Sequence, residues 1–217
     1  MNEDKQKIAE ALELLQNPKA LKRESGAKRL RKLNVPETGE ALFRALQKEM
    51  LDKRTWSSQY NLLLTIGVVG YKPALPFLWN LAAREFDATI LYMALGDAIF
   101  RLSLQKQTVA EAWQEILHTQ NPGLLYGASR AIAMLQLVPD DETIRNIIAV
   151  AERPEFVDGV RGHPGDMTGL RYWVVLASAH WKPEIRYDFL IRCQAINTTL
   201  KLNADDVLKG KRIKLDY

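Results

Sequence analysis

The stretch Asn121-Pro-Gly-Leu-Leu-Tyr-Gly-Ala-Ser-Arg-Ala-Ile132 decides the fold class, because it joins a helix start to a helical apolar period. Asn121 followed by Pro122 is typical of a helix N-terminus, since the amide side chain accepts an orphan backbone N–H and proline fits the first turn. Leu124 and Ala128 lie four residues apart, on one helix face. Similar patterns recur along the chain without clear period-two segments, so the sequence predicts an all-α protein.

Five predicted helices carry the same apolar stripe at positions i, i+3, i+4, i+7 and i+8, and the stripes begin 31 to 46 residues apart. The stripes are Arg23/Gly26/Ala27/Leu30/Arg31, Tyr60/Leu63/Leu64/Gly67/Val68, Leu91/Ala94/Leu95/Ala98/Ile99, Leu124/Gly127/Ala128/Ala131/Ile132 and Leu170/Trp173/Val174/Ala177/Ser178. Their small residues let neighbouring helices approach closely, as stacked helical hairpins require. Because a single hairpin cannot bury its own stripe, we expect a right-handed α-solenoid of about five hairpins.

Two of these segments, residues 22–33 and 121–132, resemble the second helix of HEAT-like repeats, in which an Asp-Pro start and an arginine precede a small pair. Arg23 stands for the arginine, whereas Leu125 replaces it in the later segment. The resemblance covers about residues 17–195. It implies that first helices line a convex side and second helices a concave side. An irregular helical bundle and an armadillo-type or tetratricopeptide-type array are the alternatives.

The chain of 217 residues is long enough for one well-buried core without metal or disulfide cross-links. We expect a single HEAT-like repeat domain over residues 1–195, with an inserted loop near 153–169, and a C-terminal segment over 196–217 that ends in a basic tail. The loop holds His163 and two aspartates, but no regular ligand spacing, so no metal is expected. A recognition loop, a flap over the concave face and an inert insertion remain open.

Residues at i+2, i+6 and i+9 of the second helices point away from the stripe, so we expect them to line a concave groove. The expected partner-binding residues are Leu62, Ile66, Val69, Met93, Asp97, Phe100, Tyr126, Arg130 and Tyr172. An apolar row exposed to water usually marks a partner site. The alternative is that the tail or the loop covers these helices. Asp97 and Arg130 occupy equivalent positions, and a salt bridge between them is their simplest explanation.

The chain has 30 Lys and Arg residues against 26 Asp and Glu, for a net charge of +4. Basic residues gather near residues 19–32 and 209–214. The candidate phosphate-binding residues are Arg23, Lys28, Arg29, Lys32, Lys211 and Arg212. Such clusters can neutralise nucleic-acid phosphates. A solvated helix face and a frayed tail are the simpler interpretation, because a dedicated surface usually carries a continuous basic stripe.

No motif for catalysis, for a cofactor or for phosphate binding is evident, so an enzyme is the less favoured class. The three histidines, His118, His163 and His180, have no nucleophile in a recognisable arrangement, and Cys193 is expected to be a small buried side chain. The five tryptophans are expected in the core. The single cysteine, the absence of a signal-peptide pattern and the short apolar runs predict a cytoplasmic protein with no membrane span.

These features predict a non-enzymatic protein-binding module, such as an adaptor, an assembly factor or an inhibitor of the immunity type, whose partner is another protein or a peptide. Nucleic acid is the alternative partner. Some DNA glycosylases that act on alkylated bases are HEAT-like, and residues 130–137 resemble an arginine-bearing helix in them. Their Trp-Trp-Asp cluster is missing from residues 91–97, where only Asp97 could stand for the acid.

Overall fold

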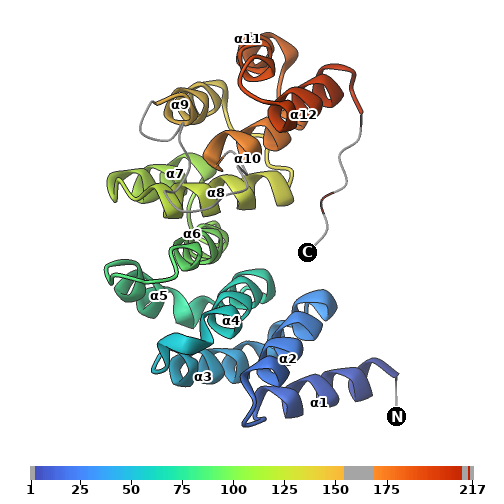
Figure 1. Ribbon diagram of the computed structural model, residues 1–217, viewed down its shortest axis with the longest axis vertical. Coiled ribbons are helices and arrows are strands. Elements are labelled where there is room, and N and C mark those ends of the chain that lie inside the picture. The colour runs from blue at the N-terminus through green and yellow to red at the C-terminus, as the bar shows by residue number, and fades with distance from the viewer. Residues whose placement is uncertain (1–2, 154–168, 212–214, 216–217) are drawn as a thin grey trace. The chain divides into compact units, whose positions relative to one another are not determined.

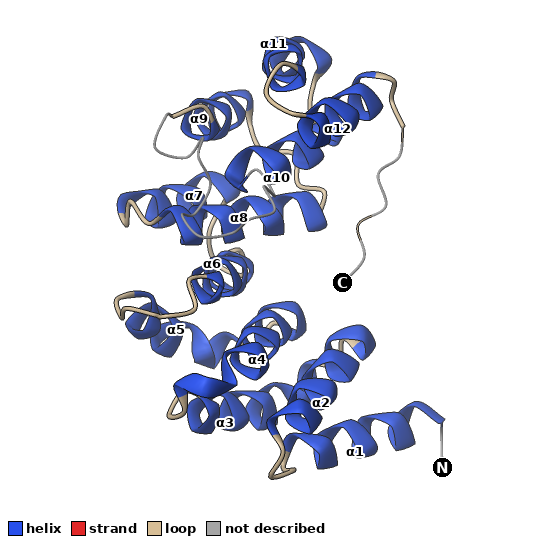
Figure 2. Cartoon of the chain, in the orientation of Figure 1, coloured by secondary structure: helices blue, strands red, loops and turns tan. Residues whose placement is uncertain are grey.

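The computed structural model describes residues 3–153, 169–211 and 215, and in these residues the regular elements are twelve α-helices and four short 3₁₀ helices, with no strand (Figure 2). The expected all-α class is confirmed. The chain divides into two compact units, residues 1–106 and 107–216. The division at 106/107 differs from the single domain over 1–195 that the sequence suggested.

Unit 1 consists of α1 (Glu3–Leu15), α2 (Ala20–Leu33), α3 (Gly39–Glu49), α4 (Trp56–Val69), α5 (Leu75–Ala82) and α6 (Ile90–Ser103) (Figure 1). The short 3₁₀ helices η1 (Pro36–Thr38), η2 (Lys53–Thr55) and η3 (Lys72–Ala74) lead into α3, α4 and α5. Helix α2 packs on α1 and α4, α4 also packs on α3 and α6, and α5 packs on α6. The even-numbered helices therefore form the middle of the unit.

Small residues set the spacing of α2 from α1 and of α4 from α6. A Cβ atom at Gly26 would lie 2.8 Å from the carbonyl oxygen of Ala11, and one at Gly67 would lie 2.7 Å from the Cα atom of Ala98. Neither distance is possible for real side chains, so a larger residue at either position pushes two helices apart. The close approach predicted from the small residues of the stripes is thus confirmed at both contacts.

Unit 2 consists of α7 (Val109–His118), α8 (Pro122–Met134), α9 (Asp141–Ala151), α10 (Gly169–Ala177), η5 (Ser178–His180), α11 (Pro183–Gln194) and α12 (Thr198–Leu208). Helix α10 packs on α8, α9 and α12, while α11 packs on α9 and α12. The predicted start of α8 is confirmed, because the Asn121 side chain accepts hydrogen bonds from the backbone N–H groups of Gly123 and Leu124 at 2.9 and 3.3 Å.

The C-terminal segment expected over residues 196–217 contains a packed helix before its basic end. Leu200, Ala204 and Val207 lie at positions i, i+4 and i+7 of α12 and are buried, which is the pattern of a core-facing helix stripe. The helical core of unit 2 therefore continues to Leu208. The inserted loop and the end of the basic tail lie largely outside the described residues, and so do Asp158, Arg161, His163, Asp166 and Arg212.

The five predicted stripes fall on α2, α4, α6, α8 and α10, and most of their members are buried. The stripes of α6 and α8 are buried at every position. The exceptions, which stay partly exposed, are Arg23, Arg31, Tyr60, Val68 and Trp173. Hydrophobic periodicity therefore located the core faces of the even-numbered helices correctly.

Candidate functional site

The expected groove residues of α4 and α6 are buried instead of exposed. Leu62, Ile66, Val69, Met93, Asp97 and Phe100 are each at most 7% exposed. In α4 the cause is its composition and its neighbours: the helix is apolar nearly all round, and α2, α3 and α6 pack against it. The expectation that these six side chains line an open groove is therefore wrong.

The three expected groove residues in unit 2 lie around a fourth residue, Trp173. The ring centroid of Trp173 lies 6.4 Å from that of Tyr126 and 5.2 Å from that of Tyr172, both in edge-to-face geometry. The guanidinium carbon of Arg130 lies 5.5 Å from the Trp173 ring centroid, within cation–π range. We call Tyr126, Arg130, Tyr172 and Trp173 the aromatic cluster. Its three rings are partly exposed, whereas Arg130 is buried.

The aromatic cluster consists of three uncharged rings and one cation, the guanidinium of Arg130, which contacts the Trp173 ring. Burial raises the pKa of the Tyr126 phenol above its ordinary value, against the opposing effect of the positive charge on Arg130. The phenol therefore stays protonated at neutral pH and remains a hydrogen-bond donor. Sequence reasoning placed Trp173 in the core because it lies on the stripe of α10, and it missed that the residue is only half-buried.

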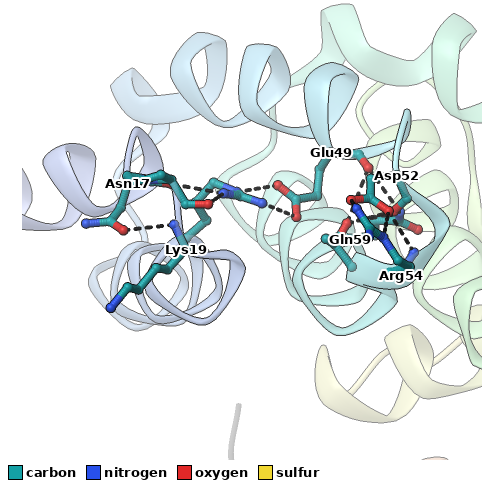
Figure 3. Close-up of polar contacts among 9 residues, drawn as sticks. Asn17, Lys19, Glu49, Asp52, Arg54 and Gln59 are labelled. Carbon is teal, nitrogen blue, oxygen red and sulfur yellow. Dashed lines mark hydrogen bonds and ion pairs between the residues drawn. The ribbon is translucent and has the colours of Figure 1, made fainter.

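The guanidinium of Arg23, a candidate phosphate ligand, already donates hydrogen bonds to oxygen atoms within the protein. Its Nε and Nη2 atoms donate to the two carboxylate oxygens of Glu49 at 2.5 and 2.9 Å, and its Nη1 atom donates to the carbonyl oxygens of Asn17 and Pro18. Asn17 and Glu49 are labelled in Figure 3. The hydrogen bonds to Glu49 raise the pKa of Arg23 further. Arg23 thus joins the α1–α2 turn to the end of α3, which argues against the predicted phosphate-binding role.

The other described basic candidates are exposed, and three of them lie near carboxylates. Lys28 forms an ion pair with Glu24 one helical turn away, and Lys211 pairs with Asp206 at 2.7 Å. Arg29 lies 4.0 Å from a carboxylate oxygen of Glu10. Lys32 is exposed at the end of α2. Phosphate binding by these four residues stays a prediction.

Three turns of unit 1 meet along one edge, which we call the loop edge: residues 16–19, 50–55 and 83–89. Besides Arg23, two further contacts hold these turns. Gln59, a buried residue of α4, donates from Nε2 to the carbonyl oxygens of Glu49 and Asp52 at 3.0 and 2.8 Å (Figure 3). Lys53 lies 3.4 Å from Asp87, which links the second turn to the third.

The middle turn of the loop edge is also fixed by its own charges. Asp52 accepts hydrogen bonds from the backbone N–H of Arg54 at 3.1 Å and from its guanidinium at 2.9 and 2.8 Å. These hydrogen bonds lower the pKa of Asp52 to about 2 and raise the pKa of Arg54. The carboxylate is therefore ionised at any physiological pH, and the start of η2 keeps its cap.

A pocket of about 110 Å³ lies between the second and third turns of the loop edge. It is lined by Met50, Lys53, Trp56, Gln59, Arg84, Glu85, Phe86, Asp87, Ala88 and Leu91. The four charged residues among them are exposed, and we call these four the rim; the apolar ones other than Trp56 are half-buried or buried. Trp56 is 48% exposed, and Leu51, which follows the lining residue Met50 in the chain, is 86% exposed. Large apolar side chains are thus presented to solvent next to a preformed hollow.

Sequence reasoning assigned Trp56 to the core and so missed this pocket. Trp113 and Trp181 are buried, but Trp56 is the first residue of α4. The charged turn that precedes it, Asp52-Lys53-Arg54, was the available signal.

Among the described residues, we find no catalytic arrangement of the groups that could react. Burial raises the pKa of the Cys193 thiol to about 12, which removes its nucleophilic form at neutral pH. His118 and His180 are exposed. Within the described ranges, no group of three or more His, Cys, Asp or Glu side chains is placed to hold a metal ion.

No helix in the described part of the chain is both long and apolar enough to cross a membrane. The HEAT-like resemblance rests on residues 22–33 and 121–132 alone and stays a prediction. No family model, curated protein or solved structure matches the chain.

Proposed function

We propose that the chain is a non-enzymatic protein-binding module, built as a right-handed α-solenoid of HEAT-like hairpins, whose loop edge takes up an apolar side chain of a partner protein. The observation that carries the proposal is the pocket beside half-exposed Trp56. Trp, Met and Phe side chains are the types enriched at the centres of protein interfaces, and the pocket combines Trp56 with Met50 and Phe86.

The bracing of the loop edge supports the same function. Arg23 joins the first turn to Glu49 at the end of α3, Gln59 holds the second turn on α4, and the exposed Lys53–Asp87 pair links the second turn to the third. A surface that is ordered before binding loses less conformational entropy when a partner docks. Loops held on a rigid helical scaffold are also where binding residues commonly lie.

The charges at the rim indicate the kind of partner. Lys53 and Arg84 are balanced by Glu85 and Asp87, so the rim is neutral overall. A neutral polar rim around an apolar centre is the usual anatomy of a protein–protein interface. It gives little attraction for a polyanion, which needs several unpaired cations.

Packing between successive even-numbered helices supports the solenoid part of the proposal. In unit 1, α2 packs on α4 and α4 on α6, and in unit 2, α8 packs on α10. Each contact joins the second helix of one predicted hairpin to that of the next, which is the nearest-neighbour pattern of repeat arrays.

Site-specific photo-crosslinking tests the proposed function. A photoreactive amino acid at Leu51, next to the pocket, should form a discrete adduct with a partner protein in an extract of the source cells. The Trp56→Ser substitution in the same protein should remove the adduct. The control places the probe at Leu202 of α12, which is 60% exposed. Identical adducts from both positions, or an adduct that survives Trp56→Ser, would contradict the proposal.

The aromatic cluster supports nucleic-acid binding as a second candidate function. Aromatic rings with an arginine provide stacking platforms for bases, each worth about 1–3 kcal/mol. Trp173→Ala should then weaken the binding of single-stranded DNA by at least about fivefold in a salt-titrated mobility assay. An unchanged affinity would remove this candidate.

The DNA-glycosylase alternative gains no support from the expected acid. Asp97 is fully buried, and its carboxylate accepts a hydrogen bond from Arg101 Nε at 2.7 Å. A buried carboxylate in this arrangement is not accessible to a base of bound DNA. Incubation with alkylated duplex DNA tests the alternative directly, because release of a free base would establish the activity.

A further inference from the structure

Helix α11 carries apolar side chains on the face opposite to its core contacts. Phe189, Leu190 and Cys193 are buried and point toward α9, α10 and α12. Tyr187 and Ile191, one helical turn apart, are 55% and 42% exposed. With 100° between successive residues, Ile191 lies nearly opposite the centre of the buried face. Tyr187 and Ile191 therefore form a narrow apolar strip along this face, with exposed charged residues beside it.

The charges along the exposed side of α11 change sign from one end to the other. Glu184 and Asp188 are exposed in the first half of the helix, and Arg192 is exposed in the second half. Arg192 contacts both carboxylate oxygens of Glu152, at 2.6 and 3.1 Å, yet its side chain remains 55% exposed. The exposed side of the helix is therefore acidic toward its N-terminus and basic toward its C-terminus, which is the favourable order with respect to the helix dipole.

We propose that α11 pairs with α11 of a second copy of this chain in an antiparallel, two-fold symmetric contact. That arrangement sets Ile191 of each copy against Tyr187 of the other and brings Asp188 opposite Arg192. In a parallel two-fold pair, Asp188 and Arg192 of the two copies would lie on opposite flanks of the contact and could not pair with one another. A two-fold contact needs a patch that complements itself, and the charges of α11 meet this condition in the antiparallel orientation.

The size of the patch makes the expected dimer weak. Twelve residues of helix span about 18 Å, so the buried area falls below the roughly 1,200–2,000 Å² of stable interfaces. We therefore expect a reversible monomer–dimer equilibrium with a dissociation constant in the range of about 10 µM to 1 mM. This contact is separate from the loop edge, so its test does not depend on the proposed function.

Sedimentation equilibrium of the full chain tests the apolar part of the proposal. Between about 10 µM and 1 mM protein, the average mass should rise from 24.7 kDa toward that of a dimer. Ile191→Glu should weaken the association at least tenfold. The matched control is Leu202→Glu, an exposed leucine of α12, which should leave it unchanged. A monomer at every concentration, or association that Ile191→Glu does not affect, would overturn the proposal.

Charge reversal tests the antiparallel orientation. Asp188→Arg alone and Arg192→Asp alone should each weaken the dimer severalfold, because each places like charges opposite one another. The double variant with both substitutions restores opposite charges in an antiparallel pair and should recover most of the affinity. Circular dichroism should show native helix content for all variants, since these side chains are exposed. A double variant as weak as the single ones would contradict the antiparallel contact.

Discussion

Helices α4 and α11 both carry apolar side chains on opposite faces, yet only α4 buries both faces. Helix α4 packs on α2, α3 and α6, and ten of its fourteen residues are buried. Helix α11 packs on α9, α10 and α12 with one face and exposes Tyr187 and Ile191 on the other. Apolar residues in one helix therefore mark faces that can be buried, and the number of neighbouring helices decides which faces are.

A glutamate introduced into α4 should lower the free energy of unfolding far more than one introduced into α11. Leu62→Glu puts an unpaired carboxylate at a fully buried position of α4 and should lower the free energy of unfolding by about 4 kcal/mol or more. Ile191→Glu on the exposed face of α11 should change it by no more than about 0.5 kcal/mol at a dilution where the chain is monomeric. Urea denaturation measures both. Equal losses in the two variants would show that the contrast between the helices is wrong.

Two arginine–glutamate pairs extend the same comparison to polar contacts. The Arg23–Glu49 side chains are 16% and 2% exposed, whereas those of Arg192–Glu152 are 55% and 29% exposed. Arg23→Met leaves a buried carboxylate without its cation and should destabilise the protein by about 3 kcal/mol. Arg192→Met should have an effect of about 0.5 kcal/mol.

A double variant separates the charge effect from lost packing. In Arg23→Met/Glu49→Leu both charges are gone, so the free energy of unfolding should return most of the way to that of the wild type. If the double variant is as unstable as Arg23→Met, the pair acts through its shape rather than through its charges.

Cys193, on the buried face of α11, gives a smaller and pH-dependent effect. Its pKa is raised from 9.0 to about 12 in the folded protein, so the stabilising effect is complete below pH 9 and is lost as the pH rises toward 12. At pH 10 the wild type should lose about 1.4 kcal/mol that Cys193→Ala does not lose, relative to pH 8. Urea denaturation of both proteins at the two pH values measures the difference. Equal losses would show that the thiol is accessible.

The sequence predicted the fold class and the core faces well. The stripes of α6 and α8 are buried as expected, because small and apolar residues at helical spacing report directly on close packing. The start of α8 followed from Asn121 and Pro122, since caps are local chemistry.

The sequence could not predict which of the remaining helix faces are open. Leu62 and Phe100 were expected in a groove, but their exposure depends on helices far away in the sequence. The pocket beside Trp56 depends on residues 50–59 and 84–91 meeting in space. The turn contacts of Arg23 and Gln59 likewise join distant segments, so no local pattern reports them.

Hydroxyl-radical footprinting of the full chain tests most directly the claim that apolar side chains at the loop edge are exposed, whereas those expected in a groove on α4 and α6 are buried. Trp56 and Leu51 should be oxidised rapidly, whereas Met93 and Phe100 should be protected in spite of their high intrinsic reactivity. Unfolding in urea should remove the protection and provides the reference rates. Oxidation of Met93 and Phe100 in the native protein as fast as that of Trp56 would contradict the account and restore the open groove.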